Sequence, residues 1–359
     1  MKYLTLWALL CILFGCGGTS QEEAPKKPSK IIFGYLQYEQ LPEYQIPWDQ
    51  LTHLSIAFGR ATEEGGLADA ANIEKLLPIF REGQKKGVKV LLSAGGGGNK
   101  AIMAGVLLND TYRNRFKKEL LKAVEDWGFD GLDIDYEHWA GGPEGYGEGD
   151  KEKVALLENF YKELRTELPK GKLLTAAVSA DYPEWNGGWG NYNVYTNSMF
   201  EYLDLVNIMV YDFTGGWKSS KVAQHASMEH FRMAAKRWSE IRGVPKEKII
   251  LGVPFYGVHF VSAETPVGAT HMPYKEILTN YPNEQATEKD EIGLLFYNGK
   301  PTMRAKAGYV NDNGYGGIMI WAISHDSPNK EESLLQVLYD AFTCLLYTSP
   351  SPRDRTRSR

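Results

Sequence analysis

The sequence contains only three cysteines in 359 residues: Cys11, Cys16 and Cys344. All three lie near the ends of the chain, so the long stretch between them has none. This excludes a disulfide framework and a cysteine-based metal site. A body of this length without cross-links has to be stabilised by its apolar core.

Basic residues are outnumbered by acidic ones. The chain has 40 Lys and Arg against 45 Asp and Glu, which gives a formal net charge of −5 at pH 7. The first 15 and last 16 residues carry five basic residues and one acidic residue, so the stretch between them has a net charge of −9. Such an acidic protein is a poor binder of nucleic acid, and we expect no nucleic-acid partner.

The longest apolar run is at the start of the chain. The stretch "MKYLTLWALLCILFGCGG" places one Lys before about a dozen apolar residues, which is typical of a secretory signal peptide and too short to span a membrane stably. The run ends in "LFGC", which resembles a bacterial lipobox and implies cleavage before Cys16 and a lipid on its sulfur. We therefore predict a lipoprotein signal peptide over 1–15, a flexible tether over 16–30 and a lipid anchor in the bacterial cell envelope. The alternative is an ordinary secretory signal with an incidental cysteine.

The last residues differ abruptly in composition from the amphipathic helical pattern that ends at Thr343. The stretch "CLLYTSPSPRD" resembles the translation of a sequencing-library adaptor. We therefore interpret residues 344–359 as read-through rather than native sequence. The alternative is a genuine basic tail for nucleic acid or a membrane, and fresh sequencing of the gene from an unamplified source distinguishes the two.

Residues 31–343 alternate between short apolar runs and segments with the period of a helix. Eight runs have the length and composition of buried strands: 30–38, 51–59, 88–96, 130–137, 172–180, 204–213, 248–257 and 316–324. Helical patterns cover 73–87, 110–128 (capped by Asp110 or Thr111), 151–168 and 227–243. Eight strand–helix units predict an α/β fold closed into a (β/α)8 TIM barrel. The alternative, an open doubly wound sheet, usually carries a dinucleotide or phosphate loop, and "SAGGGGN" (93–99) has neither spacing.

The strand "DGLDIDYE" (130–137) carries a carboxylate at every second position near its end. Side chains two residues apart in a strand point the same way, so Asp133, Asp135 and Glu137 share one face while apolar side chains share the other. In a barrel the apolar face suits the surrounding helices, and the acids point into the interior. Glu137 lies nearest the carboxyl-terminal mouth, where barrel enzymes hold their catalytic groups.

Acids this close together cannot all ionise easily, so one has a raised pKa and keeps its proton near neutral pH. We predict that Glu137 is the general acid, that Asp135 shares its proton and that Asp133 hydrogen-bonds to Asp135. A purely structural acidic strand is disfavoured because buried carboxylates need partners. A metal site is disfavoured because three ligands along one strand span too far for one ion. No second carboxylate stands across the bond, as the two-carboxylate glycosidase mechanism requires.

Four motifs then occur in order along the chain. The stretch "SAGG" (93–96) fits SxGG, "DGLDIDYE" (130–137) fits DGxDxDxE, "MVYD" (209–212) fits MxYD, and "GYGGIMIWAISHD" (314–326) is similar to an eighth barrel strand. With these motifs, residues 31–343 resemble the family 18 glycoside hydrolases, the chitinase family.

The resemblance implies a retaining, substrate-assisted mechanism in which the N-acetyl oxygen of the substrate attacks the anomeric carbon and forms an oxazolinium ion. Glu137 would protonate the leaving oxygen and then activate water, and Asp135, supported by Asp133, would orient the acetamido group. Tyr211 would hydrogen-bond the acetyl group. The resemblance implies no metal and no other cofactor.

Larger members of this family carry an α+β insertion between strands seven and eight. Here only about 58 residues separate Gly257 from Gly316. We therefore predict a reduced or absent insertion, a hairpin at "YNGKP" (297–301) turned by Asn-Gly, and a shallow, open cleft.

Sugars stack on aromatic side chains, and the chain has 9 Trp and 21 Tyr. The candidate substrate-binding residues lie in the motifs above, at strand ends or in the loops that follow them. They are Tyr35, Phe58, Gly96, Trp139, Met209, Asp212, Trp217, Tyr256 and Trp321. The resemblance implies that Trp321 is the floor of the sugar site.

We therefore predict a monomeric, surface-tethered glycosidase that hydrolyses β-1,4 bonds next to N-acetylglucosamine in chitin or chito-oligosaccharides. The alternative is an endo-β-N-acetylglucosaminidase that acts on N-glycans with the same acids. A lectin-like carbohydrate binder is less favoured, because such members usually have the acid replaced and Glu137 is present.

Overall fold

A computed structural model describes residues 27–41, 43–137, 151–180 and 195–343, and eight of its parallel strands close into a barrel. The barrel strands, in chain order, are β1 (Ile31–Gln37), β2 (His53–Gly59), β3 (Lys89–Gly95), β4 (Gly131–Asp135), β5 (Leu173–Ser179), β6 (Leu205–Met209), β7 (Ile249–Pro254) and β12 (Gly317–Trp321). Each strand pairs with the next one in the chain, and β12 closes the ring against β1. The predicted TIM barrel is confirmed.

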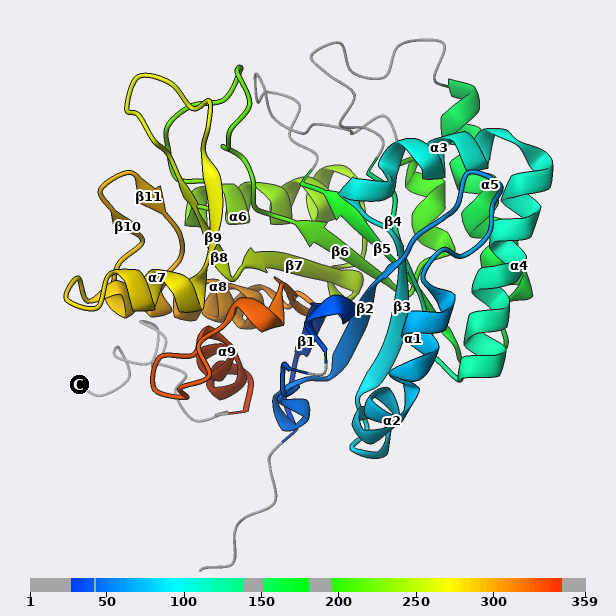
Figure 1. The fold of residues 1–359 in the computed structure, drawn as a ribbon, viewed down its shortest axis with the longest axis horizontal. Coiled ribbons are helices and arrows are strands. Elements are labelled where there is room, and N and C mark those ends of the chain that lie inside the picture. Colours follow the sequence, from blue (N-terminus) through cyan, green and yellow to red (C-terminus); the bar gives the residue numbers. More distant parts are fainter. Residues whose placement is uncertain (1–26, 42, 138–150, 181–194, 344–359) are drawn as a thin grey trace, which may run out of the picture.

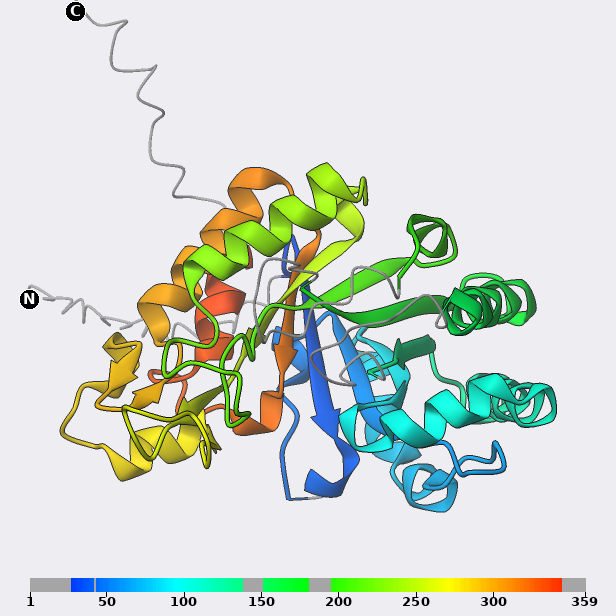
Figure 2. The same cartoon turned by 90° about the horizontal axis from the view of Figure 1, so that it is seen from above.

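The helices of the described chain wrap around the barrel (Figure 1). They are α1 (Ala70–Lys75), α2 (Leu77–Lys85), α3 (Lys100–Leu108), α4 (Asp110–Trp127), α5 (Lys151–Glu167), α6 (Met228–Lys236), α7 (Tyr274–Asn280), α8 (Lys300–Asn313) and α9 (Leu334–Thr343). Helices α3, α4 and α5 lie on one side, and α7 lies on the opposite side (Figures 1 and 2). In the part of the chain that the structure describes, no helix is both long and apolar enough to cross a membrane.

The alternation predicted for the acidic strand is present in β4. Leu132, Ile134 and Tyr136 belong to the large apolar cluster that joins the strands to the helices. Asp133 and Asp135 point the other way and are 0% and 4% exposed. The barrel interior also holds a separate small apolar cluster, which includes Phe33, Leu91 and Met319 from three other strands.

An α+β insertion is present between β7 and α8, so the alternative that it is absent is wrong, and its reduced size relative to larger family members stays a prediction. It consists of α7 and an antiparallel sheet of β8 (Tyr256–His259), β9 (Thr270–Pro273), β10 (Glu291–Ile292) and β11 (Leu295–Phe296). Tyr256 begins β8 rather than ending β7, because the barrel strand stops at Pro254. The open cleft stays a prediction.

The predicted Asn-Gly hairpin is wrong. Tyr297 follows β11, and Gly299 is the N-cap of α8, so this segment starts a helix. The two-residue hairpin turn lies earlier, between Ile292 and Leu295, where Gly293 adopts the left-handed conformation with φ of 59°. Glycine populates this conformation at little cost, so the turn forms there instead.

Two helix predictions also need correction. The single helix expected over 73–87 is divided at Leu76 into α1 and α2, because Pro78 lies in the first turn of α2 and cannot donate to a preceding helical turn. The N-cap of α4 is Asn109, not Asp110 or Thr111, and its side chain accepts from the backbone N–H groups of Thr111 and Tyr112.

Candidate active site

Asp133 lies at the base of the acid column and is fully buried. Its register partners are Ser93 on β3 and Thr175 on β5, whose hydroxyls donate to it at 2.8 and 2.5 Å. Tyr35 and Asn207 donate from across the barrel at 2.7 and 3.2 Å. Burial raises the pKa of Asp133, and these four hydrogen bonds oppose that rise. The predicted hydrogen bond to Asp135 is replaced by four neutral donors, which satisfy both carboxylate oxygens.

Asp135 and Glu137 are neighbouring carboxyl groups above Asp133, and each affects the pKa of the other. Burial raises the pKa of Asp135 well above its ordinary value, and the charges of Glu137 and Asp133 add to the rise. Burial also raises the pKa of Glu137, to about 7, with a further rise from Asp212. A hydrogen bond joins the two carboxyl groups, and the Gly97 N–H also donates to Glu137. A half-buried carboxyl that keeps a proton near pH 7 can act as a general acid.

The glycine-rich loop after β3 makes room for this pair. Gly96 has φ of 83°, and a Cβ there would lie 2.7 Å from the Phe58 ring. Its N–H donates to the Asp135 carbonyl at 2.9 Å. A Cβ on Gly97 would lie 3.3 Å from Glu137 Oε2. At these distances the glycines keep side chains out of the space beside the acids, and Gly97 is a site residue that the sequence analysis missed.

The segment after β6 brings two predicted residues to the mouth. The Tyr211 hydroxyl lies 3.6 Å from Met319 Sδ, and its ring packs edge-on against Tyr256 at 6.2 Å between centroids. Asp212 has φ of 57° and accepts a hydrogen bond from the Tyr256 hydroxyl at 2.7 Å. Met209, at the end of β6, is half-buried and packs against the interior cluster.

Three aromatic side chains pack together beside the acids. Trp321 is half-buried, and the Phe58 ring stacks on it at 5.6 Å with an interplanar angle of 23°. Tyr35 lies 5.9 Å from Trp321 and is only 1% exposed. The structure therefore places Tyr35 beneath the site, where its hydroxyl serves Asp133, and leaves Trp321 as the more exposed of these two rings.

The two remaining tryptophan candidates differ in what the structure describes. Trp217 is half-buried and packs against Gly215, where a Cβ would lie 2.2 Å from its ring. Trp139 lies outside the described residues, as does the predicted lipidation site Cys16. Substrate contact by both tryptophans stays a prediction.

Several site residues were missed by the sequence analysis. Three of them could have been predicted. Ser93 and Thr175 are the register partners of Asp133 on the two adjacent strands. Asn207 lies two residues before Met209 on β6, so the two side chains point to the same face. His225 and His271 could not have been predicted in this way. They come from the segment after β6 and from the insertion, and both approach Asp212.

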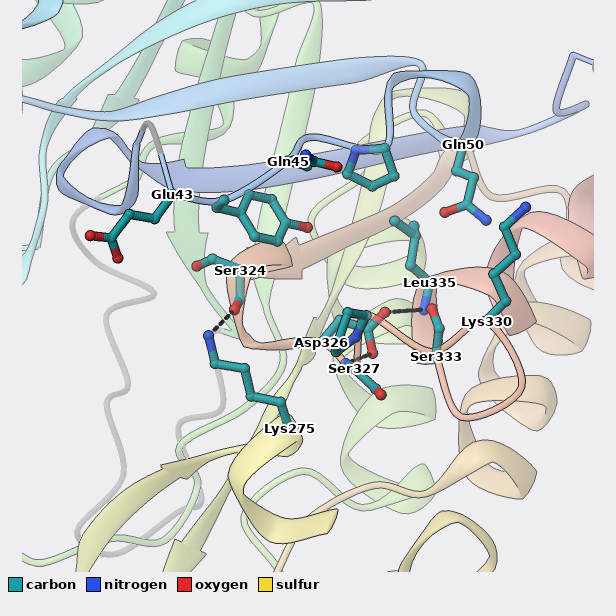
Figure 3. A pocket seen from close by; sticks show the side chains of 13 residues that line it. Glu43, Gln45, Gln50, Lys275, Ser324, Asp326, Ser327, Lys330, Ser333 and Leu335 are labelled. Carbon is teal, nitrogen blue, oxygen red and sulfur yellow. Dashed lines mark hydrogen bonds between the residues drawn. The ribbon is translucent and has the colours of Figure 1, made fainter. Parts of the chain in front are cut away.

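A cavity of about 410 Å³ lies between the β1–β2 connection and the segment after β12 (Figure 3). Lys275 donates to the Ser324 carbonyl at 2.9 Å. The buried Asp326 accepts from the Ser333 hydroxyl at 2.6 Å and from the Leu335 N–H at 3.0 Å, so it caps α9. None of the predicted site residues lines this cavity.

Across residues 27–41, 43–137, 151–180 and 195–343, no group of three His, Cys, Asp or Glu side chains is arranged to hold a metal ion. The described site presents carboxyl groups, a tyrosine hydroxyl and aromatic faces.

Neighbouring acids with raised pKa values at the carboxyl ends of barrel strands, next to partly buried aromatic rings, are the arrangement expected of a barrel glycosidase. The sequence profile of the Glycosyl hydrolases family 18 matches residues 31–326, and the chain belongs to this family. The predicted chitinase-like family is thus confirmed, and the chain is a glycoside hydrolase.

Relatives and solved structures agree with this assignment. The chain is 31% identical to an endochitinase of Brugia malayi over 82% of this chain and 69% of that protein. It is similar to the GH18 chitinase ChiB of Flavobacterium johnsoniae, with a TM-score of 0.73 and 30% identity over 88% and 95% of the two chains. A mutant class V chitinase from Nicotiana tobaccum in complex with NAG4 has a TM-score of 0.70 and 25% identity over 87% and 99% of the chains. The chain spans about two thirds or less of the length of several other curated relatives.

Proposed function

We propose that the protein hydrolyses β-1,4 bonds next to N-acetylglucosamine in chitin or chito-oligosaccharides, with retention of configuration. The observation that carries the proposal is the Asp135–Glu137 pair, in which burial and neighbouring charge raise the pKa of Glu137 to about 7. The names of the relatives, which are chitinases, favour chitin over other glycans that contain N-acetylglucosamine.

In the first step Glu137 donates its proton to the glycosidic oxygen while the carbonyl oxygen of the substrate's acetamido group attacks the anomeric carbon. The carbon–oxygen bond to the leaving sugar breaks, and an oxazolinium ion forms. The carboxylate of Asp135 accepts a hydrogen bond from the acetamido N–H and stabilises the positive charge, while the Tyr211 hydroxyl donates to the acetyl oxygen. This explains why the site needs no second carboxylate across the bond: the substrate supplies the nucleophile that a carboxylate supplies in other retaining glycosidases.

In the second step the Glu137 carboxylate takes a proton from water. The resulting hydroxide attacks the anomeric carbon and opens the oxazolinium ring, which restores the acetamido group. The double displacement retains the anomeric configuration. Asp133 keeps its four hydrogen bonds throughout and supports Asp135 from below.

The experiment compares chitin oligosaccharides with a high-mannose glycopeptide as substrates for the exported domain and its Glu137→Gln variant. We expect cleavage of the chitin oligosaccharides, β-anomeric products at early times by NMR, and at least a thousandfold loss of kcat in the variant with substrate binding retained. Cleavage of the glycopeptide alone would favour the N-glycan enzyme. Binding of the chitin oligosaccharides without any cleavage would favour the lectin.

We also propose that the protein is a monomer held at the cell envelope by a lipid on Cys16. The support is the lipobox-like "LFGC" before the tether. Mass spectrometry of the mature amino terminus and size-exclusion chromatography of the unanchored domain test the two parts. A Cys16→Ala chain that remains in the membrane fraction would contradict the anchor.

A further inference from the structure

Helix α3 is apolar on every side. After Lys100 its residues are AIMAGVLL, of which the inward-facing ones are buried: Met103, Ala104, Val106 and Leu107. The outward face is exposed and consists of Ala101, Ile102, Gly105 and Leu108. Leu108 alone is 49% exposed. A surface helix usually presents polar residues to the solvent, and a helix that is apolar all round is usually buried. The outward face of α3 therefore differs from that of an ordinary surface helix.

A second exposed apolar surface lies on the connection between β8 and β9. Val261 and Val267 are 67% and 50% exposed. A Cβ on Gly216 would lie 3.0 Å from the Ala269 carbonyl oxygen. The connection therefore adjoins the segment that carries Trp217, a predicted substrate-binding residue.

Both surfaces belong to the end of the barrel that holds the acids. Helix α3 follows the glycine-rich loop at the carboxyl end of β3, and the hairpin of β8 and β9 follows the carboxyl end of β7. Three barrel strands separate β3 from β7 in either direction around the ring, so the two surfaces lie on opposite sides of the mouth (Figure 1).

The exposed large hydrophobic side chains of the described residues are concentrated at this end. Four of the five are Ile102, Leu108, Val261 and Val267. The fifth, Ile241, precedes the amino end of β7 and lies at the other end of the barrel. Single exposed apolar side chains are common on protein surfaces, but a concentration of them around one site indicates a contact surface.

The two surfaces carry little charge. Lys100 is the one charged residue of α3, and Glu264 is the one charged residue between β8 and β9. A charged partner would be attracted by a cluster of opposite charges, so these surfaces suit an uncharged partner with apolar faces. Packed chains of β-1,4-linked N-acetylglucosamine are such a partner, because the polymer is uncharged and its sugar rings expose CH groups that gain from burial.

The chain enters the barrel from the opposite end. Residues 27–30 lead to the amino end of β1, and the Ser29 N–H donates to the Phe342 carbonyl at 2.7 Å. A lipid on Cys16, as proposed above, would therefore hold the membrane nearer the amino ends of the strands than the mouth. This arrangement favours a polymer over a lipid bilayer as the partner of surfaces at the mouth.

We propose that these two surfaces dock the protein on the face of solid chitin. They are the α3 rim (Ala101, Ile102, Gly105 and Leu108) and the hairpin rim (Val261 and Val267). The mouth between the rims then lies over a chain of the polymer surface, so the protein acts on insoluble chitin and is held there by contacts outside the catalytic site. The small residues of the α3 rim suit a flat partner, because no long polar side chain holds the helix away from it. This inference rests on the proposed hydrolysis of chitin.

The experiment measures adsorption to washed chitin particles, release of soluble sugars from them, and kcat/KM with the soluble N-acetylglucosamine tetramer. It uses the exported chain without its lipid and two double variants, Ile102→Gln with Leu108→Gln and Val261→Gln with Val267→Gln. Each double variant loses apolar area that docking would bury, so we expect adsorption and the rate on particles to fall about fivefold or more. The value of kcat/KM on the tetramer should stay unchanged, because both rims lie outside the acid site.

The matched control is Ile241→Gln, which removes a side chain that is 67% exposed at the other end of the barrel. It should leave adsorption and both reactions unchanged. Unchanged adsorption in both rim variants, or an equal loss in the control, would overturn the inference. Rim variants that adsorb to chitin normally but lose binding to phosphatidylcholine vesicles, or lose a dimer seen for the parent, would assign the rims to a lipid surface or to a second copy of the chain.

Adsorption is measured without turnover, so failure of docking and failure of the proposed function are distinct. Inactivity of the parent on the tetramer would overturn the proposed hydrolysis. A parent that cleaves the tetramer while both rim variants adsorb and act on particles as the parent does would overturn the docking surface alone.

Discussion

The Tyr35 hydroxyl lies 2.7 Å from Asp133 Oδ2 and joins the first barrel strand to the fourth across the interior. The two residues are 98 positions apart in the chain, and both are buried. The same hydroxyl accepts a hydrogen bond from Asn207 at 3.0 Å. The lowest acid of the column is therefore held by neutral donors from opposite sides of the barrel, without a salt bridge.

Tyr35→Phe is expected to lower both stability and activity. The change leaves one buried carboxylate oxygen of Asp133 with a donor fewer, which costs about 1–3 kcal/mol of unfolding free energy. Since Asp133 then ionises less readily, the field on Asp135 changes and kcat falls about tenfold. Urea unfolding and steady-state kinetics measure the two effects.

The control for this prediction is Tyr297→Phe, which removes a buried hydroxyl bonded to the Ala286 carbonyl at 2.8 Å in the insertion. It should lose similar stability and keep kcat. Equal kcat losses in the two variants would show that Tyr35 acts only through the fold.

Glu137→Gln is expected to stabilise the protein at about pH 8 but not at about pH 4. Burial and then the Asp212 charge raise the pKa of Glu137 to about 7, above the value of roughly 4.3 for an unfolded Glu. The native state therefore holds the extra proton between these values. The contribution of Glu137 to stability is full below pH 4 and is lost as the pH rises through 7. Glutamine cannot ionise and avoids this loss.

Thermal unfolding midpoints at about pH 4, 6 and 8 measure this difference, with the exposed Glu125→Gln as control. A midpoint difference between parent and Glu137→Gln that does not change with pH would contradict the raised pKa.

Gly97→Ala is expected to lower kcat about tenfold, whereas Gly98→Ala is expected to have little effect. A Cβ on Gly97 would lie 3.3 Å from Glu137 Oε2, while a Cβ on Gly98 would have no neighbour within 4 Å. Small displacements of a catalytic group are costly because the reacting atoms have to be aligned. The pair of variants separates crowding of the acid from a general loss of loop flexibility. Equal kcat in both would remove the steric argument.

An oligosaccharide of β-1,4-linked glucosamine without acetyl groups should resist hydrolysis, while the N-acetylated tetramer should be cleaved. The reason is that the acetamido oxygen is the proposed nucleophile, and a free amine does not supply it. Product analysis by mass spectrometry measures both reactions. Comparable cleavage of the two would indicate a protein nucleophile and contradict substrate assistance.

The parts that followed from local patterns were predictable. The alternation in β4 was sufficient to orient Asp133, Asp135 and Glu137, because the two faces of a strand are fixed by backbone geometry. The eight strand-length apolar runs predicted the barrel, because the length and composition of a run are also local properties of the sequence. Predictions that depended on a single local signal were less reliable: the Asn-Gly pair at 298–299 precedes α8, and the turn forms at Gly293 instead. The helix over 73–87 was divided by Pro78, whose effect depends on its position in the turn.

The partners of the acids depended on the tertiary structure. The amino-acid pattern was enough to predict that one strand carries a column of acids ending at Glu137. It also predicted that no second carboxylate lies across the bond to be cleaved. Only the fold decided that Asp133 is held by Tyr35, Thr175 and two other donors rather than by Asp135. The fold also decided that His271, 134 residues after Glu137, lies beside Asp212. The physical reason is that strand period is a property of adjacent residues, whereas the pKa of a buried acid depends on whatever groups closure of the barrel brings within a few ångströms.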